Sequence, residues 1–170
     1  MQNKARDEEL GCFFDCCHRH GLKITPQRIA IYRELVKTRN HPSAEEMYRT
    51  VRRLHPNISY DTVNRTLQTF ASVGLIDVVE GIGGVRRFDS DRNPHHHFHC
   101  RICGRIIDFH SRQFDAMEIP DHIRKIASVD SKHIVLSGVC RRCQSKQPAL
   151  SCEKKIIIKE KHHGKNRRQH

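Results

Sequence analysis

Apolar residues recur with the period of an amphipathic helix in three stretches of the N-terminal half. The first begins at Thr25, a helix-capping residue, and Pro26, which suits the first helical turn, and its apolar positions are Ile29, Ile31, Tyr32 and Leu35. The second begins with a capping box from Ser43 to Glu46 and ends before Pro56, with one face formed by Met47, Val51 and Leu54. We therefore expect two capped helices here.

The third stretch runs from Ser59, again a capping residue, to Gly74, and its buried stripe is Val63, Leu67 and Phe70. A β-hairpin is expected next, because apolar-rich runs at 75–79 and 85–88 flank the glycine-rich tip at 81–84. Helices followed by such a hairpin predict a winged helix-turn-helix, whose third helix enters the major groove of DNA.

The outward face of this third helix carries side chains that can read base edges. Arg65 can bind a guanine edge with two hydrogen bonds, and Asn64 or Gln68 can do the same for adenine. The alternative is an ordinary polar helix face without a role in binding. Arg86 and Arg87 on the wing favour DNA binding, because they stand where a contact to the minor groove or to phosphate is expected. The residues that we expect to contact DNA are Tyr60, Thr62, Asn64, Arg65, Gln68, Arg86 and Arg87.

From residue 95 the sequence changes to short strands and clusters of cysteine and histidine. Runs at 97–100 and 105–109 predict a strand pair, 113–128 predicts helix broken near Pro120, and 132–137 predicts a further strand. The fold class is therefore α+β: a winged helix at 1–88, a hinge at 89–94, a small α/β domain rich in metal-binding residues at 95–148, and a flexible basic tail at 149–170.

The charge balance points to an acidic partner. Lysine and arginine total 31 against 19 aspartate and glutamate, a net charge of +12, and the excess is dense in the tail. That tail is either simply solvated or adds nonspecific attraction to phosphates. No apolar run approaches the roughly 18 residues of a membrane span. The opening residues Met1-Gln2-Asn3-Lys4 lead into charged chain, so we expect no secretory signal, no membrane partner and a cytoplasmic location.

Eight cysteines in a chain without a secretory signal favour metal binding over disulfides. Four of them form two C-x2-C pairs, Cys100 with Cys103 and Cys140 with Cys143. Two such turns complete a tetrahedral site of four thiolates, which suits one structural Zn²⁺ and leaves no open position. A redox disulfide would need only one reactive pair at a helix start. The others are interpreted as core or incidental thiols: Cys12, Cys16, Cys17 and Cys152.

In order and spacing, these motifs resemble the ferric-uptake-regulator (Fur) family of bacterial metal-dependent repressors. The likeness covers roughly residues 10–146, and the stretches that carry it are 21–28, 41–46, 61–65, 87–89, 95–104, 107–110 and 138–143. It implies a transcriptional regulator rather than an enzyme. It further implies a homodimer that binds a palindromic operator in double-stranded DNA, with 95–148 as the small α/β dimerisation domain that holds the four-cysteine zinc site.

The resemblance also implies a regulatory metal site on His41, Asp89, His95, His97 and Asp108. His95 and His97 are two residues apart, so on one strand they face the same way. Imidazoles and carboxylates favour Fe²⁺ or Mn²⁺ over thiolate-loving ions, so we expect one such ion per subunit besides one Zn²⁺. Since the ligands come from both domains, the metal would clamp them in one orientation.

Within the family, the sequence is most similar to PerR-type, peroxide-responsive repressors, which have Asp at the position of Asp89 where iron sensors carry Glu. This similarity implies that peroxide reacts with bound Fe²⁺, that His41 or His95 is oxidised, and that repression ends. Asn64 stands where the family usually has Tyr, and Arg65 is more typical of iron repressors. An iron- or zinc-responsive repressor without peroxide sensing is therefore the alternative.

A third metal site of the family is not predicted. His96 and Asp115 stand where relatives have ligands, but Pro94 and Lys132 replace two others. Two other classes of protein are also disfavoured. A zinc hydrolase or deaminase needs a general-base glutamate in H-x-E or H-E-x-x-H, which the sequence lacks. A zinc-ribbon adaptor would have the cysteine turns without the helix-and-wing order.

Overall fold

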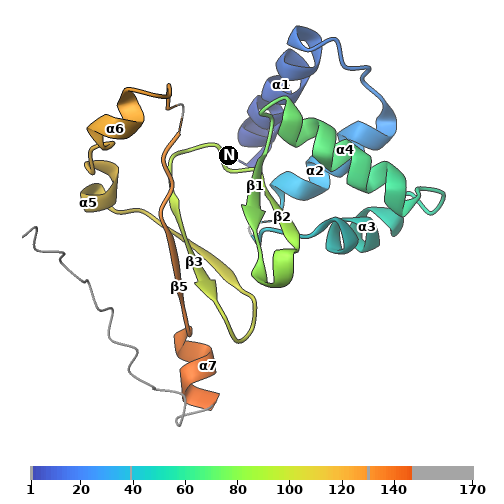
Figure 1. Ribbon diagram of the computed structural model, residues 1–170. Helices are drawn as coiled ribbons and strands as arrows, with labels where there is room; N and C mark the ends of the chain where they lie inside the picture. The colour runs from blue at the N-terminus through green and yellow to red at the C-terminus, as the bar shows by residue number, and fades with distance from the viewer. Residues whose placement is uncertain (1, 39, 130, 147–170) are drawn as a thin grey trace, which may run out of the picture. The chain divides into compact units, whose positions relative to one another are not determined.

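The computed structural model describes residues 2–38, 40–129 and 131–146 (Figure 1). The predicted tail at 149–170 and Cys152 lie outside the described residues. The elements follow in the order α1 (Gln2–Arg19), α2 (Pro26–Val36), α3 (Ala44–Arg52), α4 (Tyr60–Ser72), β1 (Asp77–Glu80), η1 (Ile82–Gly84), β2 (Arg86–Asp89), β3 (His96–Cys100), β4 (Ile106–Phe109), α5 (Arg112–Asp115), α6 (Asp121–Arg124), β5 (Val135–Gly138) and α7 (Arg141–Lys146).

The three predicted helices of the N-terminal half begin at their predicted caps. The Thr25 side chain accepts a hydrogen bond from the backbone N–H of Arg28 at the start of α2. The Ser59 side chain accepts one from the backbone N–H of Thr62 at the start of α4. At the start of α3, Ser43 and Glu46 form both bonds of the capping box. Each cap stabilises its helix by about 0.5–2 kcal/mol, so these local signals position the helices well.

No helix is predicted before residue 25, yet α1 supplies part of the core. Phe13 is fully buried, with its ring stacked on Tyr32 at a centroid distance of 5.0 Å and edge-on to Phe70 at 5.8 Å. A side chain of this kind stabilises the fold by about 1.5–3 kcal/mol through burial alone. The helical spacing of Leu10, Phe13, Phe14 and Cys17 is the signal that could have revealed α1.

One predicted buried position is wrong. Leu54 was expected on the buried face of the second helix, but α3 ends at Arg52 and the Leu54 side chain is 61% exposed. The Leu54 N–H bonds to the carbonyl of Val51, three residues earlier. This tighter turn rotates Leu54 away from the face on which Met47 and Val51 are buried.

The predicted hairpin is confirmed. Strands β1 and β2 pair antiparallel, with Asp77 opposite Asp89. The turn between them has Gly83 and Gly84 at φ +74°, a conformation that costs glycine little. Phe88 is buried against the helical core and anchors the hairpin to it. Asp89 is the last residue of β2, so it belongs to the wing strand rather than to a linker.

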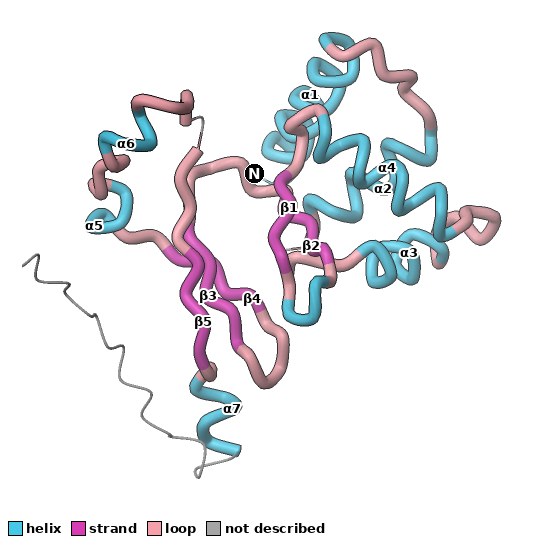
Figure 2. Tube along the Cα trace, viewed as in Figure 1, coloured by secondary structure: helices cyan, strands magenta, loops and turns pink. Residues whose placement is uncertain are grey.

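The second sheet has the strand order β4-β3-β5 (Figure 2). β4 runs antiparallel to β3 and places Asp108 opposite His97, whereas β5 runs parallel to β3. A parallel pair needs a crossover connection, which the chain makes through α5 and α6. As predicted, the helical segment is broken near Pro120, which caps α6.

The chain divides into two compact units, Met1–Val139 and Cys140–His170. The described part of the second unit is Cys140–Lys146, in which α7 follows directly after Cys140. The α+β class is confirmed, whereas the domain limits expected near residues 88–94 stay a prediction.

Candidate functional site

Four buried side chains of the first unit gather into one cluster of metal-binding type: His41, Asp89, His95 and His97. His41 lies between α2 and α3, Asp89 ends β2, and the other two stand at the start of β3. Asp89 Oδ2 lies 3.1 Å from His41 Nε2, 2.9 Å from His95 Nε2 and 3.5 Å from His97 Nε2. All four are at most 7% exposed, so the cluster is shielded from water.

Asp108 is the fifth predicted ligand and closes the open side of the cluster. Its Oδ1 lies 3.1 Å from His41 Nε2, 3.6 Å from His97 Nε2 and 4.0 Å from His95 Nε2. The pairing of β4 with β3 explains this position, because Asp108 is the register partner of His97. The Asp108 side chain is 35% exposed, so it is the member of the set that solvent reaches. The structure thus brings all five predicted residues together.

The spacing of these atoms fits a divalent ion. Two ligand atoms on adjacent positions around an ion with bonds of about 2.1 Å are separated by about 3.0 Å. The Nε2 atoms of His95 and His97 are 2.9 Å apart, and both meet the carboxylate of Asp89. Three imidazole nitrogens with carboxylate oxygens form a donor set for Fe²⁺ or Mn²⁺ rather than for thiolate-loving ions.

Electrostatics favours an ionised carboxylate in this cluster. Burial alone would raise the pKa of Asp89, but hydrogen bonds from His41 and His97 and from the backbone N–H of Asp91 outweigh it and hold the pKa far below its usual range. For His95, burial lowers the pKa, but the bond to the Asn93 carbonyl and the nearby carboxylates raise it overall. The site therefore keeps a negative charge where a cation would bind.

His41 has an unusual backbone. Its φ is +46°, a left-handed conformation that is costly for a residue with a side chain, by about 1–3 kcal/mol. Surrounding contacts must hold it there, and some come from the wing: Phe88 N–H donates to the Pro42 carbonyl, and Arg87 Nη1 donates to the His41 carbonyl. Arg87, predicted to contact DNA, thus turns its guanidinium toward the metal cluster.

The paired cysteines are held in tight turns. The Gly104 N–H donates to the Cys100 carbonyl, with Gly104 at φ +68°, and the Cys143 N–H donates to the Cys140 carbonyl. Cys100, Cys103, Cys140 and Cys143 form a group that could hold a metal ion, as predicted. Among the remaining cysteines, Cys16 and Cys17 are core residues, as interpreted, and Cys12 is exposed.

The outward face of α4 is accessible. Tyr60, Arg65 and Gln68 are exposed, Thr62 and Asn64 are half-buried, and Arg86 on the wing is exposed. This arrangement agrees with the predicted orientation of the helix, in which Val63, Leu67 and Phe70 are buried.

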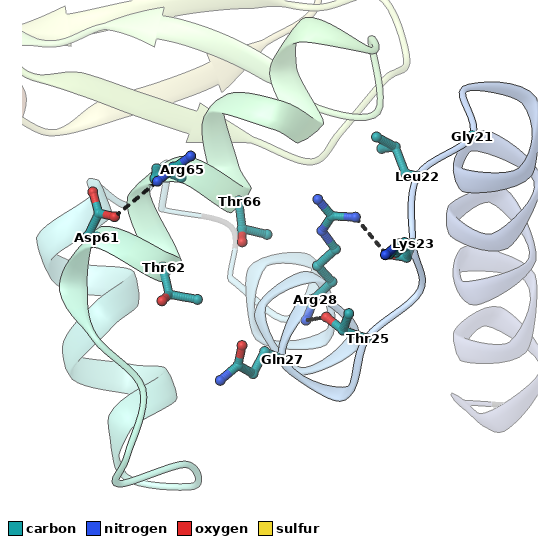
Figure 3. A pocket seen from close by; sticks show the side chains of 10 residues that line it. All are labelled: Gly21, Leu22, Lys23, Thr25, Gln27, Arg28, Asp61, Thr62, Arg65 and Thr66. Carbon is teal, nitrogen blue, oxygen red and sulfur yellow. Dashed lines mark hydrogen bonds and ion pairs between the residues drawn. The ribbon is translucent and has the colours of Figure 1, made fainter.

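A groove of about 550 Å³ adjoins this face of α4 (Figure 3). Its walls are the start of α2 with the loop before it, and the residues of α4 that include Arg65. Lys23, Gln27 and Arg28 line the groove but are not among the residues predicted to contact DNA. The signal for them was two basic residues beside a capped helix start. Arg28 Nη1 donates to the Lys23 carbonyl at 2.6 Å, so the loop and α2 form one surface.

Near His96 and Asp115, the ammonium of Lys132 bonds to the backbone. His96 Nε2 and Asp115 Oδ1 are 3.2 Å apart, and Lys132 Nζ donates to the carbonyls of Asp115 and Met117. The Lys132 ammonium thereby holds the end of α5.

A winged helix together with a buried histidine–aspartate cluster defines a metal-responsive DNA-binding regulator. A sequence model described as the ferric uptake regulator family matches residues 19–136. The chain belongs to this family. Among the described residues, no helix is both long and apolar enough to cross a membrane.

Individual relatives are similar over most of their length. The chain is 34% identical over 139 residues to the peroxide-responsive repressor PerR of Staphylococcus epidermidis, which covers 81% of this chain and 92% of the relative. The structure of the Helicobacter pylori ferric uptake regulator, described as having three functional metal-binding sites, matches with a TM-score of 0.67 at 25% identity, covering 81% of this chain and 93% of that one. The Pseudomonas aeruginosa regulator with manganese matches with a TM-score of 0.59 at 26% identity, covering 74% and 95%.

Proposed function

We propose that the chain is a metal-dependent transcriptional repressor that responds to peroxide. The observation that carries the proposal is the convergence of His41, Asp89, His95, His97 and Asp108 on one point. The resemblance to the staphylococcal PerR protein supports the peroxide response. We assign no enzymatic activity to the chain.

The ligands come from both the DNA-binding part and the second sheet. His41 lies between α2 and α3, and Asp89 lies on the wing. His95 directly precedes β3, His97 lies on β3, and Asp108 lies on β4. An ion bound by all of them favours the one arrangement in which they meet. Shifting the population from 1:99 to 99:1 takes about 5.5 kcal/mol of differential affinity. We infer that this arrangement is the DNA-binding one.

Peroxide would end repression by damaging the ligand set. Fe²⁺, when bound, would supply the electron for reduction of peroxide. The imidazoles of His41, His95 and His97 all face the site with their Nε2 atoms, and the resemblance to PerR-type repressors implies that His41 or His95 is the one oxidised. An oxidised imidazole binds metal poorly, and the arrangement of the ligands is then lost. Asp108, the exposed ligand, marks the side from which peroxide enters.

The four cysteines would hold one structural Zn²⁺ per subunit, which leaves no open coordination position. The regulators of this family bind DNA as dimers, so we propose a homodimer and a palindromic operator in double-stranded DNA. The proposed DNA contacts are Tyr60, Thr62, Asn64, Arg65, Gln68 and Arg86, with Lys23, Gln27 and Arg28 added from the groove (Figure 3).

Binding to operator DNA with and without the regulatory metal tests this function. The zinc-loaded protein should bind the operator when Mn²⁺ is added and should lose it when Mn²⁺ alone is removed by a mild chelator. His97→Ala should abolish the response, whereas His122→Ala, which changes an exposed histidine outside the cluster, should retain it. Equal DNA binding with and without Mn²⁺ would contradict the proposal.

An iron- or zinc-responsive repressor is the second candidate, because Arg65 is exposed on α4 at a position where iron repressors of the family resemble this chain. It differs from the first candidate in its response to peroxide, which would leave its DNA binding intact, and, for a zinc-responsive repressor, in the activating metal. The two candidates therefore share every prediction about the ligands and are separated by adding peroxide.

A further inference from the structure

Arg87 and the ligand Asp89 stand two residues apart on β2, and both contact His41. Asp89 meets the imidazole, whereas Arg87 Nη1 donates to the backbone carbonyl of His41 at 3.0 Å. The same Nη1 lies 3.0 Å from Glu46 Oε2. The Arg87 side chain is only 23% exposed, and its bond to the His41 carbonyl is partly buried, whereas its bond to the half-exposed Glu46 faces solvent.

The segment held by Arg87 cannot keep its shape by local preference. His41 has φ +46°, which disfavours any residue with a side chain. The segment is instead fastened to β2: Phe88 N–H donates to the Pro42 carbonyl, and Ser43 forms an isolated bridge with Arg87. The Arg87 guanidinium adds the bond that fixes the His41 carbonyl itself.

Glu46 connects this arrangement to α3. Its Oε2 accepts the Ser43 N–H at 2.7 Å in the capping box and also faces Arg87 Nη1. Burial would raise the pKa of Glu46, but the bonds from Ser43 and Arg87 lower it overall, so the carboxylate stays charged beside the guanidinium. The Arg87 side chain thus joins the wing strand to the His41 carbonyl and, through Glu46, to the start of α3.

The tip of the wing lies beside the stem of Arg87. A Cβ atom added at Gly81 would lie 2.7 Å from the Val85 carbonyl oxygen and 3.3 Å from Arg87 Nε. Only glycine fits at this point, because the Val85 carbonyl is backbone and cannot move aside easily, and the stem of Arg87 lies beside the same position. The wing therefore packs on the stem of Arg87, while the guanidinium of Arg87 holds His41.

We propose that Arg87 is a positioning residue for the regulatory ligand His41 and that it links the wing to the metal cluster in place of contacting DNA. This inference rests on the proposed function. Arg86, the exposed neighbour of Arg87, remains the wing arginine that we expect to contact DNA. Loss of a partner outside the ligand set typically weakens metal binding by about 10–100-fold, and Arg87 is expected to fall in this range.

Three zinc-loaded variants test the proposal: Arg87→Met keeps the stem, Arg87→Lys keeps the positive charge, and Arg86→Met is the matched control on the same strand. Mn²⁺ affinity should fall about 10–100-fold in Arg87→Met, recover in part in Arg87→Lys and stay unchanged in Arg86→Met. The visible spectrum of bound Co²⁺ should change in Arg87→Met, because His41 would no longer be held in its ligating position.

A readout without the regulatory metal separates positioning from general damage. In the zinc-loaded protein without Mn²⁺, amide exchange of residues 40–44 should accelerate in Arg87→Met, while exchange in α4 stays as in the wild type. Arg86→Met with the same zinc content should exchange like the wild type in both segments. Unchanged Mn²⁺ affinity and Co²⁺ spectrum in Arg87→Met would overturn the positioning role. If the wild type itself bound no Mn²⁺, the proposed function would fail instead, so the two failures are distinguishable.

Discussion

His41 and Asp89, 48 residues apart in the sequence, meet with Nε2 and Oδ2 separated by 3.1 Å. His41 comes from the segment between two helices, and Asp89 ends the wing strand. Both side chains are almost wholly buried. The pair therefore joins the helical core of the DNA-binding part to its wing at the point where the second sheet adds its own ligands.

Asp89→Asn should abolish tight Mn²⁺ binding, because an amide removes the charge that faces three imidazoles. The loss should exceed the roughly 10–100-fold typical of partners outside the ligand set. Isothermal titration of the zinc-loaded protein measures it. Asp121→Asn is the control, because Asp121 is exposed at the start of α6 and lies outside the cluster. Wild-type affinity in Asp89→Asn would exclude Asp89 as a ligand.

Cys100→Ser should release zinc and destabilise the protein, because structural zinc contributes folding free energy. The measurements are zinc content, the midpoint of thermal unfolding, and the oligomeric state by light scattering. We expect that the zinc is lost, that the unfolding midpoint falls and that the dimer dissociates. Cys12→Ser, which alters an exposed cysteine outside the four-cysteine group, should behave like the wild type. A folded, dimeric and zinc-loaded Cys100→Ser variant is the result that this assignment cannot accommodate.

Arg65→Ala should weaken sequence discrimination, because Arg65 is exposed on the face of α4 that is opposite the buried stripe. A lost bidentate guanine contact costs about 1–3 kcal/mol at the operator. Arg86→Ala should instead weaken operator and random DNA alike and reduce the salt dependence. Fluorescence anisotropy on both DNAs distinguishes the two. Equal losses for Arg65→Ala on operator and random DNA would rule out base reading by this residue.

Glu46 should contribute stability that depends on pH. Its pKa in the folded protein is lowered from the ordinary value near 4.5, so the contribution is present above pH 4.5 and is lost as the pH falls through the folded pKa. The difference in free energy of unfolding between the wild type and Glu46→Gln should therefore shrink as the pH is lowered from 6 to below 4.5. Urea unfolding across this range measures it, with Glu45→Gln as the exposed neighbouring control. A difference that does not change with pH would mean that the ionised carboxylate is not what stabilises this contact.

Much of the fold could be predicted because its signals are local. The caps at Thr25, Ser43 and Ser59 and the glycine-rich wing tip each specify a short segment by its own hydrogen bonds or backbone angles. The helix α1 was missed because its apolar positions are few among charged residues. Its place depends on Phe13 meeting Tyr32 and Phe70, which are distant in the sequence.

The ligand set was predicted from the resemblance to a family, not from local pattern. Spacing on one strand gives the pair His95 and His97, but nothing local connects them to His41. The direction of Arg87 could not be predicted either, since a basic residue on a wing is equally compatible with a DNA contact. Only the structure shows that its guanidinium bonds to the His41 carbonyl.

The most direct test of a peroxide-responsive repressor follows operator occupancy while peroxide is added to the Fe²⁺-loaded and the Mn²⁺-loaded protein. The Fe²⁺ form should release DNA and gain oxygen on the peptide that contains His41 or His95, whose Nε2 atoms face the site. The Mn²⁺ form should stay bound and unmodified, because Mn²⁺ does not generate the damaging oxidant. Release from both forms alike, or no release and no added oxygen in the Fe²⁺ form, would contradict peroxide sensing and leave a repressor that responds to metal alone.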